Sequence, residues 1–305
     1  MKTRRAIFLL GAISVLVGGI CAAQNWRSPG GRRGWGNNSG PILQTEGGDL
    51  VNEDTVRTAR ETAEHSTMIT PDWTNAPGFE KDVFTFTRVI YKLNRGPSWL
   101  GWINDYPDSD LNLSFRLQQL TSMKVDPNGR VLRLTSPDLF DYPFIFMAQP
   151  GHMELTDEEV PILRKYLCAG GVLMVDDFWG DREWQDFENE MKRVLPERSW
   201  VELPMDHPIF HCVFDLKNDK NNLQVPTIHF WQRGGITYRG SEDTRDFHVR
   251  AWLDDRQRIM VIALHNTDTG DGWEREGESV DYFKAFSETR AYPLGINIIF
   301  YIMTH

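Results

Sequence analysis

The sequence has few cysteines and no excess of basic charge. Only three cysteines occur, too few for a fold that depends on many disulfides. Cys21 belongs to the N-terminal apolar segment, and the contexts of Cys168 and Cys212 favour two separate buried thiols. The 33 Lys and Arg residues are outnumbered by 43 Asp and Glu, which gives a net charge of -10. This balance argues against nucleic acid as a partner.

Several cofactor and catalytic motifs are also absent. The chain lacks a Gly-rich dinucleotide fingerprint, a P-loop, a Gly-x-Ser-x-Gly elbow and a His-Glu-x-x-His zinc signature. The segment Asn266-x-Asp268-x-Gly-Asp271-Gly272 hints at calcium, but its acidic residues miss the EF-hand positions. A polar turn explains this segment equally well, so the sequence assigns no metal ligands.

Residues 1–23 have the pattern of a secretory signal peptide. A basic start at 2–5 precedes an apolar stretch at 6–20, and small residues suited to cleavage stand before Gln24. We therefore expect an exported protein, either periplasmic or secreted. The alternative is an uncleaved anchor, because the apolar stretch is near the shortest length that spans a bilayer. Such an anchor would be the chain's membrane contact.

The rest of the chain divides into a spacer and a folded domain. Residues 24–81 begin with many Gly, Arg, Asn and Ser residues and predict a flexible spacer, with a short helix at about 52–64. Residues 82–305 predict one folded domain. The hydrophobic content of 40% and the aromatic content of 12% are enough to fill a substantial core.

Strand patterns alternate with helix patterns in this domain. Strands are expected at 83–91, at 131–134, at the apolar end of 139–147, at 172–175 and at 258–264. One helix has a strong start signal, because Thr156 and Glu159 have capping-box spacing. A closing helix is expected over about 279–304, interrupted at 293–295. The alternation predicts an α/β domain with a mostly parallel sheet flanked by helices.

Two adjacent carboxylates, Asp176 and Asp177, follow the apolar run at 172–175. A short apolar run after a helix is typical of a central parallel strand that is covered on both faces. Ligands in such folds bind beyond the carboxyl ends of the strands. We therefore expect the acidic pair at a ligand crevice, with a structural helix cap as the alternative.

Several motifs resemble those of one uncharacterised bacterial family. The resemblance spans about residue 83 to the C-terminus and rests on Arg88-x-x-Tyr91, the loop at 99–107, Leu139-Phe-x-Tyr-Pro143, Gly151-His152, Glu159-x-x-x-Leu-Arg164, Gly170-Gly-x-Leu-x-x-Asp-Asp177, Asp206-His-Pro-Ile209, Asn266-x-Asp268 and Trp273-Glu274. On this set the chain resembles domain-of-unknown-function family 4159. The resemblance implies the class I glutamine amidotransferase-like fold, with a flavodoxin-like sheet, and implies no established activity.

The resemblance also argues against glutaminase activity. Active glutamine amidotransferases of this fold carry a nucleophilic Cys on a tight turn at the end of a central strand. Here Asp176 and Asp177 occupy that place, and no Cys lies between Cys168 and Cys212. A thiolate must reach the substrate from that turn to act as a nucleophile. We therefore expect no glutaminase activity.

Asp176, Asp177 and His207 are the candidate catalytic residues, and His152 is expected in a loop at the same end of the sheet. Two carboxylates and two histidines that converge would suit acid–base catalysis or a divalent metal. The alternative is structural, because a His before Pro often only fixes a turn.

Further candidates for ligand binding are charged and aromatic residues near the predicted strand ends. They are His152, Arg88, Trp99, Asp105, Trp179 and Asp268. Aromatic side chains in such places often bind sugars or peptides, but they also cover sheet edges. The 11 Trp residues of the chain favour the covering role slightly.

Three functions fit these observations. The first is an exported domain that binds a small polar ligand at the strand ends. The second is a hydrolase that uses the same carboxylates as acid and base, with a carbohydrate as a candidate substrate, and the third is an envelope module for a protein partner. Convergence of the candidate side chains on one pocket favours the enzyme, divergent carboxylates beside an aromatic pocket favour binding, and a flat apolar face favours the module.

Overall fold

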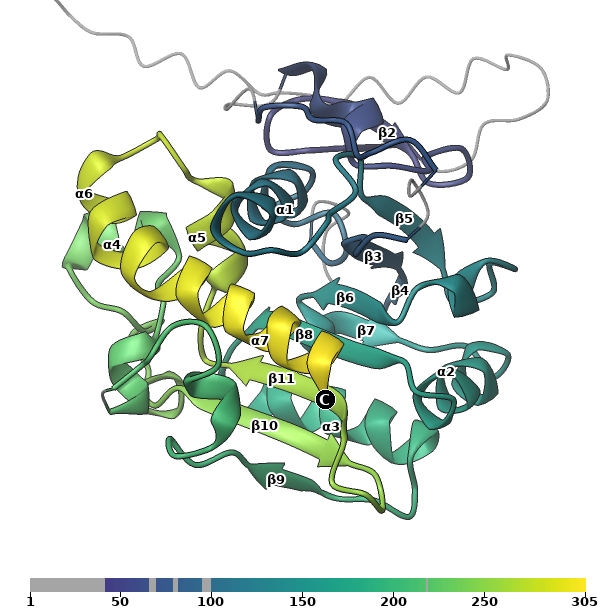
Figure 1. The fold of residues 1–305 in the computed structure, drawn as a ribbon. Coiled ribbons are helices and arrows are strands. Elements are labelled where there is room, and N and C mark those ends of the chain that lie inside the picture. The colour runs from purple at the N-terminus through teal and green to yellow at the C-terminus, as the bar shows by residue number, and fades with distance from the viewer. Residues whose placement is uncertain (1–41, 66–69, 79–81, 95–99, 218) are drawn as a thin grey trace, which may run out of the picture. The chain divides into compact units, whose positions relative to one another are not determined.

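A seven-stranded sheet forms the centre of the computed structural model, which describes residues 42–65, 70–78, 82–94, 100–217 and 219–305. In spatial order the strands are β5 (Arg130–Arg133), β3 (Thr87–Ile90), β6 (Phe144–Ala148), β8 (Val172–Phe178), β11 (Ile259–His265), β10 (His248–Leu253) and β9 (Trp200–Glu202). The first five run parallel, whereas β10 is antiparallel to both of its neighbours. The predicted α/β class with a mostly parallel sheet is confirmed (Figure 1).

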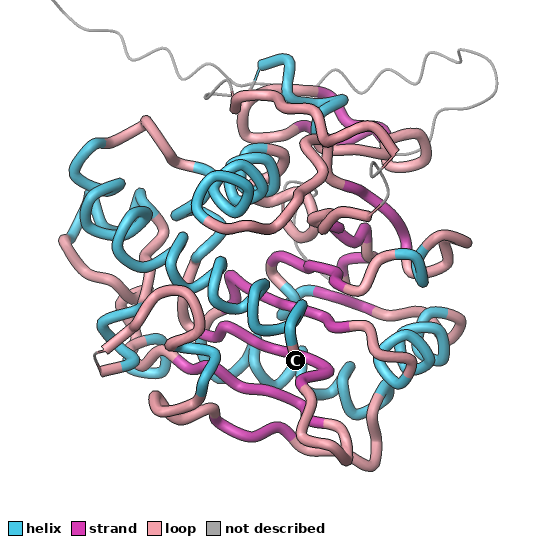
Figure 2. The backbone as a smooth tube through the Cα atoms, viewed as in Figure 1, coloured by secondary structure: helices cyan, strands magenta, loops and turns pink. Residues whose placement is uncertain are grey.

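Helices cover the sheet. They are α1 (Asp108–Leu120), α2 (Glu159–Cys168), α3 (Gly180–Val194), α4 (Ile228–Gly234), α5 (Thr269–Glu274), α6 (Val280–Tyr282), a π-helix (Phe283–Ala291) and α7 (Tyr292–Thr304). Short 3-10 helices stand at Arg60–His65, Leu139–Asp141, Pro150–His152, Pro208–Phe210, Lys220–Leu223 and Glu242–Thr244. Figure 2 shows the strands between these helices and the loops that join them.

The two faces of the sheet bury alternate residues of β8. Leu173 and Val175 belong to the core that contains residues of α2 and α3, whereas Val172 and Met174 belong to a second core with residues of α1 and α7. A parallel strand that is covered on both faces is apolar at successive positions. The apolar run at 172–175 has this cause, and Figure 1 shows α7 lying across one face.

The predicted capping box is present at the start of α2. The Thr156 N–H donates to Glu159 Oε2 at 2.9 Å, and the Glu159 N–H donates to Thr156 Oγ1 at 3.2 Å. Pro161 is the third residue of α2. The first helical turn has no intrahelical acceptors for its N–H groups, so the missing donor of Pro161 costs little.

The closing helix differs from its prediction. The helical backbone runs without a break from Val280 to Thr304 and widens into a π-helix over Phe283–Ala291. Pro293 lies in the first turn of α7, where this change of hydrogen bonding ends. The missing N–H of Pro293 is absorbed there, so the expected interruption at 293–295 does not occur.

The folded unit includes residues that composition assigned to the spacer. β1 (Ile42–Gln44) and β2 (Leu50–Asn52) form a hairpin, and the short helix expected at about 52–64 is a 3-10 helix at Arg60–His65. Val51, Val56 and Ala59 are buried in the core. Averaged composition hides these few apolar residues, because they gain burial only by packing against the rest of the domain.

Two further predictions concern the N-terminal segment and the cysteines. Residues 1–41, which include the predicted signal peptide, lie outside the described residues. Within the described ranges, no helix is both long and apolar enough to cross a membrane. Cys168 and Cys212 are unpaired, as expected, but Cys168 is exposed because it ends α2 on the surface.

Candidate functional site

A cleft of about 340 Å³ lies at the carboxyl ends of the central strands. Figure 1 shows the arrowheads of β6 and β11 pointing to the edge of the sheet where α5 lies. The polar lining of the cleft includes Asn104, Asp105, Gln149, Asp177, Arg239 and Asp268. A cleft at this end of a parallel sheet is the expected location for ligand binding.

The adjacent carboxylates at the end of β8 point in different directions. Asp176 is fully buried, and its Oδ2 accepts a hydrogen bond from the Gly270 N–H at 2.8 Å. Asp177 lines the cleft and has a left-handed backbone with a φ of 55°. Asp tolerates this conformation better than most residues. Asp176 therefore binds the start of α5, and Asp177 is the residue that the turn presents to the cleft.

Four donors hold the Asp177 carboxylate. Oδ2 accepts from Gln149 Nε2 at 2.8 Å and from Asn104 Nδ2 at 3.0 Å. Oδ1 accepts from Trp179 Nε1 at 2.8 Å and from Arg239 Nη2 at 3.0 Å. Burial raises the pKa of Asp177 to about 6, and the charge of Arg239 limits this increase.

Two further carboxylates come from the segment after β11. Asp268 caps α5 by accepting from the Asp271 N–H at 3.0 Å, and its other oxygen accepts from Thr227 Oγ1 at 2.7 Å. Asp271 Oδ1 accepts from Arg275 Nε at 3.1 Å. Burial, reinforced by neighbouring carboxylates, raises the pKa of both Asp268 and Asp271 to about 7.

Asp105 reaches the cleft from the loop before α1. Its side chain is buried, and its backbone is in the left-handed region with a φ of 59°. Its Oδ1 accepts a hydrogen bond from Asn104 Nδ2 at 2.9 Å. Burial and the nearby carboxylates, Asp268 and Glu274 among them, hold the pKa of Asp105 well above its usual value. The prediction that Asp105 lies at the strand-end site agrees with this position.

Arg88 does not line the cleft, contrary to its predicted place on a ligand-binding rim. Its side chain is completely buried, and Nε and Nη2 donate to the Asp110 carboxylate. Nη1 donates to the carbonyls of Trp102 and Asn104, at 2.7 and 2.9 Å. A buried arginine that pairs with a buried carboxylate has a structural role. Arg88 therefore positions the loop that carries Asp105.

His207 is separated from the other candidates. It caps the 3-10 helix at Pro208–Phe210, and its Nδ1 accepts from the Ile209 N–H at 3.2 Å. Its ring packs against Tyr301, which lines a cavity together with Val172 and Ile259, the first residues of β8 and β11. His207 thus lies toward the amino ends of the strands. These contacts are those of a residue that fixes a turn, and His207 is not part of the cleft lining.

The remaining candidates are distributed as follows. His152 lines the cleft, with Nε2 3.6 Å from Glu183 Oε1. Trp179 is buried, binds Asp177 and lies under the Arg239 guanidinium, 5.0 Å from the ring centre. Trp99 lies outside the described residues. The structure therefore brings Asp177, Asp105, Asp268 and His152 to one cleft, and Trp179 supports Asp177 from outside the lining.

Sequence reasoning missed several residues of the site. They are Gln149, Arg239, Asp271 and Glu274. Asp271 and Glu274 belong to segments with recognisable acidic motifs, so they offered a signal. Gln149 directly follows the apolar run at 144–148 and so offered a strand-end signal, whereas only the tertiary contact to Asp177 identifies Arg239.

The fold and the cleft define an α/β domain with an acidic cleft at the strand ends. Residues 85–303 match the family described as Domain of unknown function (DUF4159), and the chain belongs to this family. A comparison with curated proteins gave no match.

Proposed function

We propose that this domain binds a small polar ligand in the strand-end cleft. The observation that carries the proposal is Asp177, which is held by four donors on a left-handed turn at the wall of the cleft. Left-handed backbone in a non-glycine residue costs free energy and is concentrated at functional sites. The divergence of Asp176 and Asp177 also fits binding better than a paired-carboxylate enzyme.

The lining indicates the chemistry of the ligand. Asp105 and Asp268 supply acceptors, Arg239 supplies a cation, and Leu100 and Phe230 supply apolar contact. A volume of about 340 Å³ lies at the small end of ligand sites, about 300–1,000 Å³. A compact ligand with hydroxyl or amine donors, such as a single sugar unit or an amino acid, fits this lining.

A ligand screen by thermal shift tests the proposal. We expect at least one such compound to raise the melting temperature of the wild type by linkage. Asp177→Asn should lose this increase, because an amide cannot accept from all four donors that Asp177 holds at the wall of the cleft. Asp255→Asn is the matched control, since its side chain is exposed and lies outside the cleft lining.

The outcomes separate the hypotheses. Hits that persist unchanged in Asp177→Asn would contradict binding at this cleft. A wild type that responds to no compound would favour the envelope module, which pull-down with the whole chain then tests. Failure of Asp255→Asn to respond would indicate a general loss of folding rather than a local effect.

A hydrolase is the second candidate, and the pKa values of the cleft carboxyls favour it. With pKa values of about 6 and about 7, Asp177 and Asp268 are suited to exchange protons near neutral pH. Each ligand from the screen is therefore tested for turnover. Binding without product formation would exclude the hydrolase hypothesis for that ligand.

We also propose that the fold is amidotransferase-like and that glutaminase activity is absent. Asp177 stands near the end of β8, just before the chain turns into α3, where the nucleophile of active enzymes is expected. Cys168 ends α2, and the Cys212 thiol contacts the carbonyl of Asn297 in α7. A glutamine hydrolysis assay tests this, and ammonia release above a Cys168→Ser/Cys212→Ser background would contradict it.

We propose export as the location of the mature protein. The support is the basic start, the apolar stretch and the small residues before Gln24. Mass spectrometry of protein recovered from the producing bacterium should give a chain that begins at Gln24. An intact N-terminus in the membrane fraction would instead identify the segment as an anchor.

A further inference from the structure

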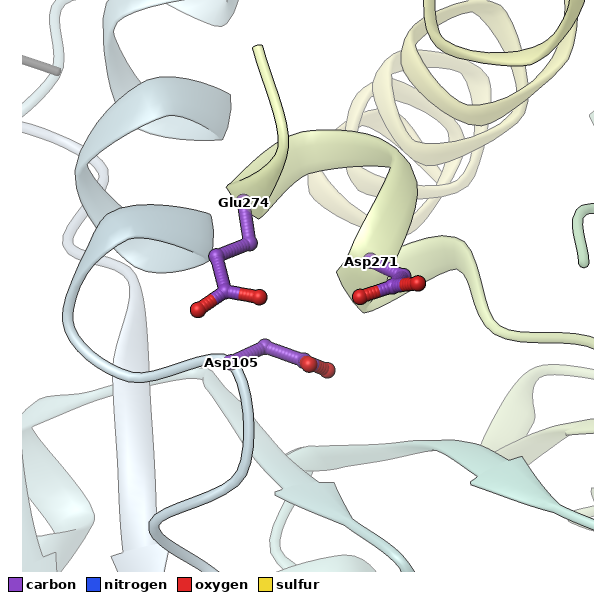
Figure 3. Close-up of side chains that lie close together, drawn as sticks. All are labelled: Asp105, Asp271 and Glu274. Atoms are coloured by element: carbon purple, nitrogen blue, oxygen red, sulfur yellow. The ribbon is translucent and has the colours of Figure 1, made fainter. Parts of the chain in front are cut away.

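We propose that Asp105, Asp271 and Glu274 together bind a divalent cation, Ca²⁺ or Mg²⁺. Each residue supplies one carboxylate oxygen, and these oxygens all lie within 4.8 Å of one another. In Figure 3 the three carboxylates approach one another from two separate segments, the loop of Asp105 and helix α5. Asp105 is shared with the small-ligand proposal, whereas the contributions of Asp271 and Glu274 belong to this proposal alone, so the two are tested separately.

The unpaired oxygen of Asp105 is the second observation that points to a cation. Asp105 is 2% exposed, and its Oδ2 has no hydrogen-bond partner among the described residues. A buried carboxylate oxygen without a donor has lost its water and gained no partner in return, which is unfavourable. Coordination to a metal ion would satisfy this oxygen.

Charge balance at the cluster also favours a cation. Arg275 is the cation beside it, with Nε 3.1 Å from Asp271 Oδ1 and 2.9 Å from Glu274 Oε2. The same guanidinium also pairs with Glu46 and Glu278. Three buried carboxylates against one shared arginine leave an excess of negative charge. A divalent ion is the simplest neutralising partner.

The pKa directions agree with this charge excess. Burial raises the pKa of Asp105 and of Glu274 well above their usual values, and like charges nearby reinforce the effect. The geometry of the oxygens carries the proposal, since it brings three possible ligands within 4.8 Å of one another.

A second combination, Asp105 with Asp177 and Asp268, also brings three oxygens within 4.8 Å of one another. The second combination is the weaker candidate, because Asp177 has little capacity left to bind an ion. Each of its oxygens already accepts two hydrogen bonds, which fills the lone pairs of a carboxylate. Asp271 and Glu274 have fewer donors. The first combination therefore has more coordination capacity.

The local fold preorganises the three ligands. Asp271 and Glu274 stand three residues apart on α5 and so share one side of the helix. Gly270 allows the close approach of Asp105, since a Cβ at position 270 would collide with Asp105 Oδ2. Arg88 donates to the carbonyls of Trp102 and Asn104 and so fixes the loop that carries Asp105.

The ligand atoms determine the class of metal. Oxygen-only sites suit Ca²⁺, Mg²⁺ and Mn²⁺, whereas Zn²⁺ and copper prefer His and Cys. Three carboxylates leave coordination positions for water on either Ca²⁺ or Mg²⁺. The calcium-like spacing at residues 266–272 contributes Asp271 to this cluster, although not in the EF-hand arrangement.

The test uses chelator-treated whole protein, titrated with CaCl₂, MgCl₂ and MnCl₂ by calorimetry and by thermal unfolding. We expect the wild type to bind at least one of these ions and to melt at a higher temperature with it. Asp105→Asn and Glu274→Gln should each weaken ion binding by about tenfold or more. Asp177→Asn and Asp268→Asn should weaken it less than Glu274→Gln does, because each removes a nearby charge but no ligand of this combination.

The melting temperature in chelator shows whether each variant is still folded. In chelator, Asp105→Asn and Glu274→Gln should melt at or above the wild-type temperature, because each removes a buried like charge. No ion binding by the wild type overturns the proposal. Loss of binding in Asp177→Asn or Asp268→Asn but not in Glu274→Gln overturns it as well, in favour of the second combination. Small-ligand binding by the ion-free protein separates this failure from that of the proposed function.

Discussion

At the residue scale, Arg88 shows how one buried side chain organises the cleft from a distance. It stands on β3 and reaches Asp110 on α1 as well as the carbonyls of Trp102 and Asn104. Both members of the ion pair are buried, at 0% and 1% exposure. The loop that presents Asp105 is therefore tied to the sheet through one guanidinium.

Replacement of Arg88 should destabilise the domain strongly. We expect Arg88→Met to lower the free energy of unfolding by about 3–5 kcal/mol, because Asp110 is left as an uncompensated buried charge. Urea unfolding measures the loss. Arg88→Met/Asp110→Asn should regain about 1 kcal/mol or more, since the double variant removes that charge. A single variant within about 1 kcal/mol of the wild type would contradict this role.

At the element scale, the strand ends of the cleft share a backbone device. Gln149 after β6, Asp177 in β8 and Asn266 after β11 all have positive φ, at 49°, 55° and 63°. Each turns the chain sharply away from the sheet and turns a polar side chain toward neighbouring segments. The Asn266 side chain, for example, accepts from the Gly180 N–H and donates to the carbonyls of Asp243 and Asp246.

The start of α2 offers a local prediction at the same scale. Thr156→Ala should lower the free energy of unfolding by about 0.5–2 kcal/mol, because the Glu159 N–H loses its side-chain acceptor. Thr156→Ser is the control, since it keeps the hydroxyl, and should stay within a few tenths of a kcal/mol of the wild type. Chemical denaturation measures both. Equal stability of the Ala and Ser variants would show that the capping box contributes nothing.

At the scale of the whole molecule, His265 links stability to pH. Its Nε2 donates to the Gly180 carbonyl at 3.0 Å, and its Nδ1 faces Arg250 Nη1 at 3.3 Å. Burial and the charge of Arg250 lower the pKa of His265 to about 3. A protonated ring would direct a second N–H at the guanidinium, so the folded state keeps the neutral form.

The sign of this linkage gives a prediction. The unfolded His binds a proton below about pH 6.5, whereas the folded one does not, so its contribution to stability is complete above pH 6.5 and falls toward pH 3. The stability deficit of His265→Gln should therefore shrink by about 1.4 kcal/mol per pH unit below pH 6.5. Urea unfolding of both proteins between pH 7.5 and 4.5 measures it. A constant deficit over this range would contradict the assignment.

Local patterns predicted much of the fold, because the signals were short-range. The apolar run of β8, the pattern of β11 and the capping box of α2 are all recognisable within ten residues. The antiparallel edge formed by β10 and β9 had no equally clear signal. Edge strands alternate less regularly, and their pairing depends on distant partners.

The site was predicted only in part. Asp177, Asp105 and Asp268 were identified because strand ends and acidic motifs are visible in the sequence. His207 is not part of the cleft lining, and nothing in its sequence neighbourhood shows at which end of the sheet its turn lies. Arg239 was missed because its role arises from a contact across 62 residues.

The sequence by itself determined the α/β alternation, the acidic end of β8 and the family, since each depends on the order of residues along the chain. Only the tertiary structure decided which carboxylates meet. Asp105 and Glu274 are far apart in sequence, yet their oxygens lie within 4.8 Å of each other. Closing a long loop is paid for by burial over the whole core, so no local pattern specifies such a contact.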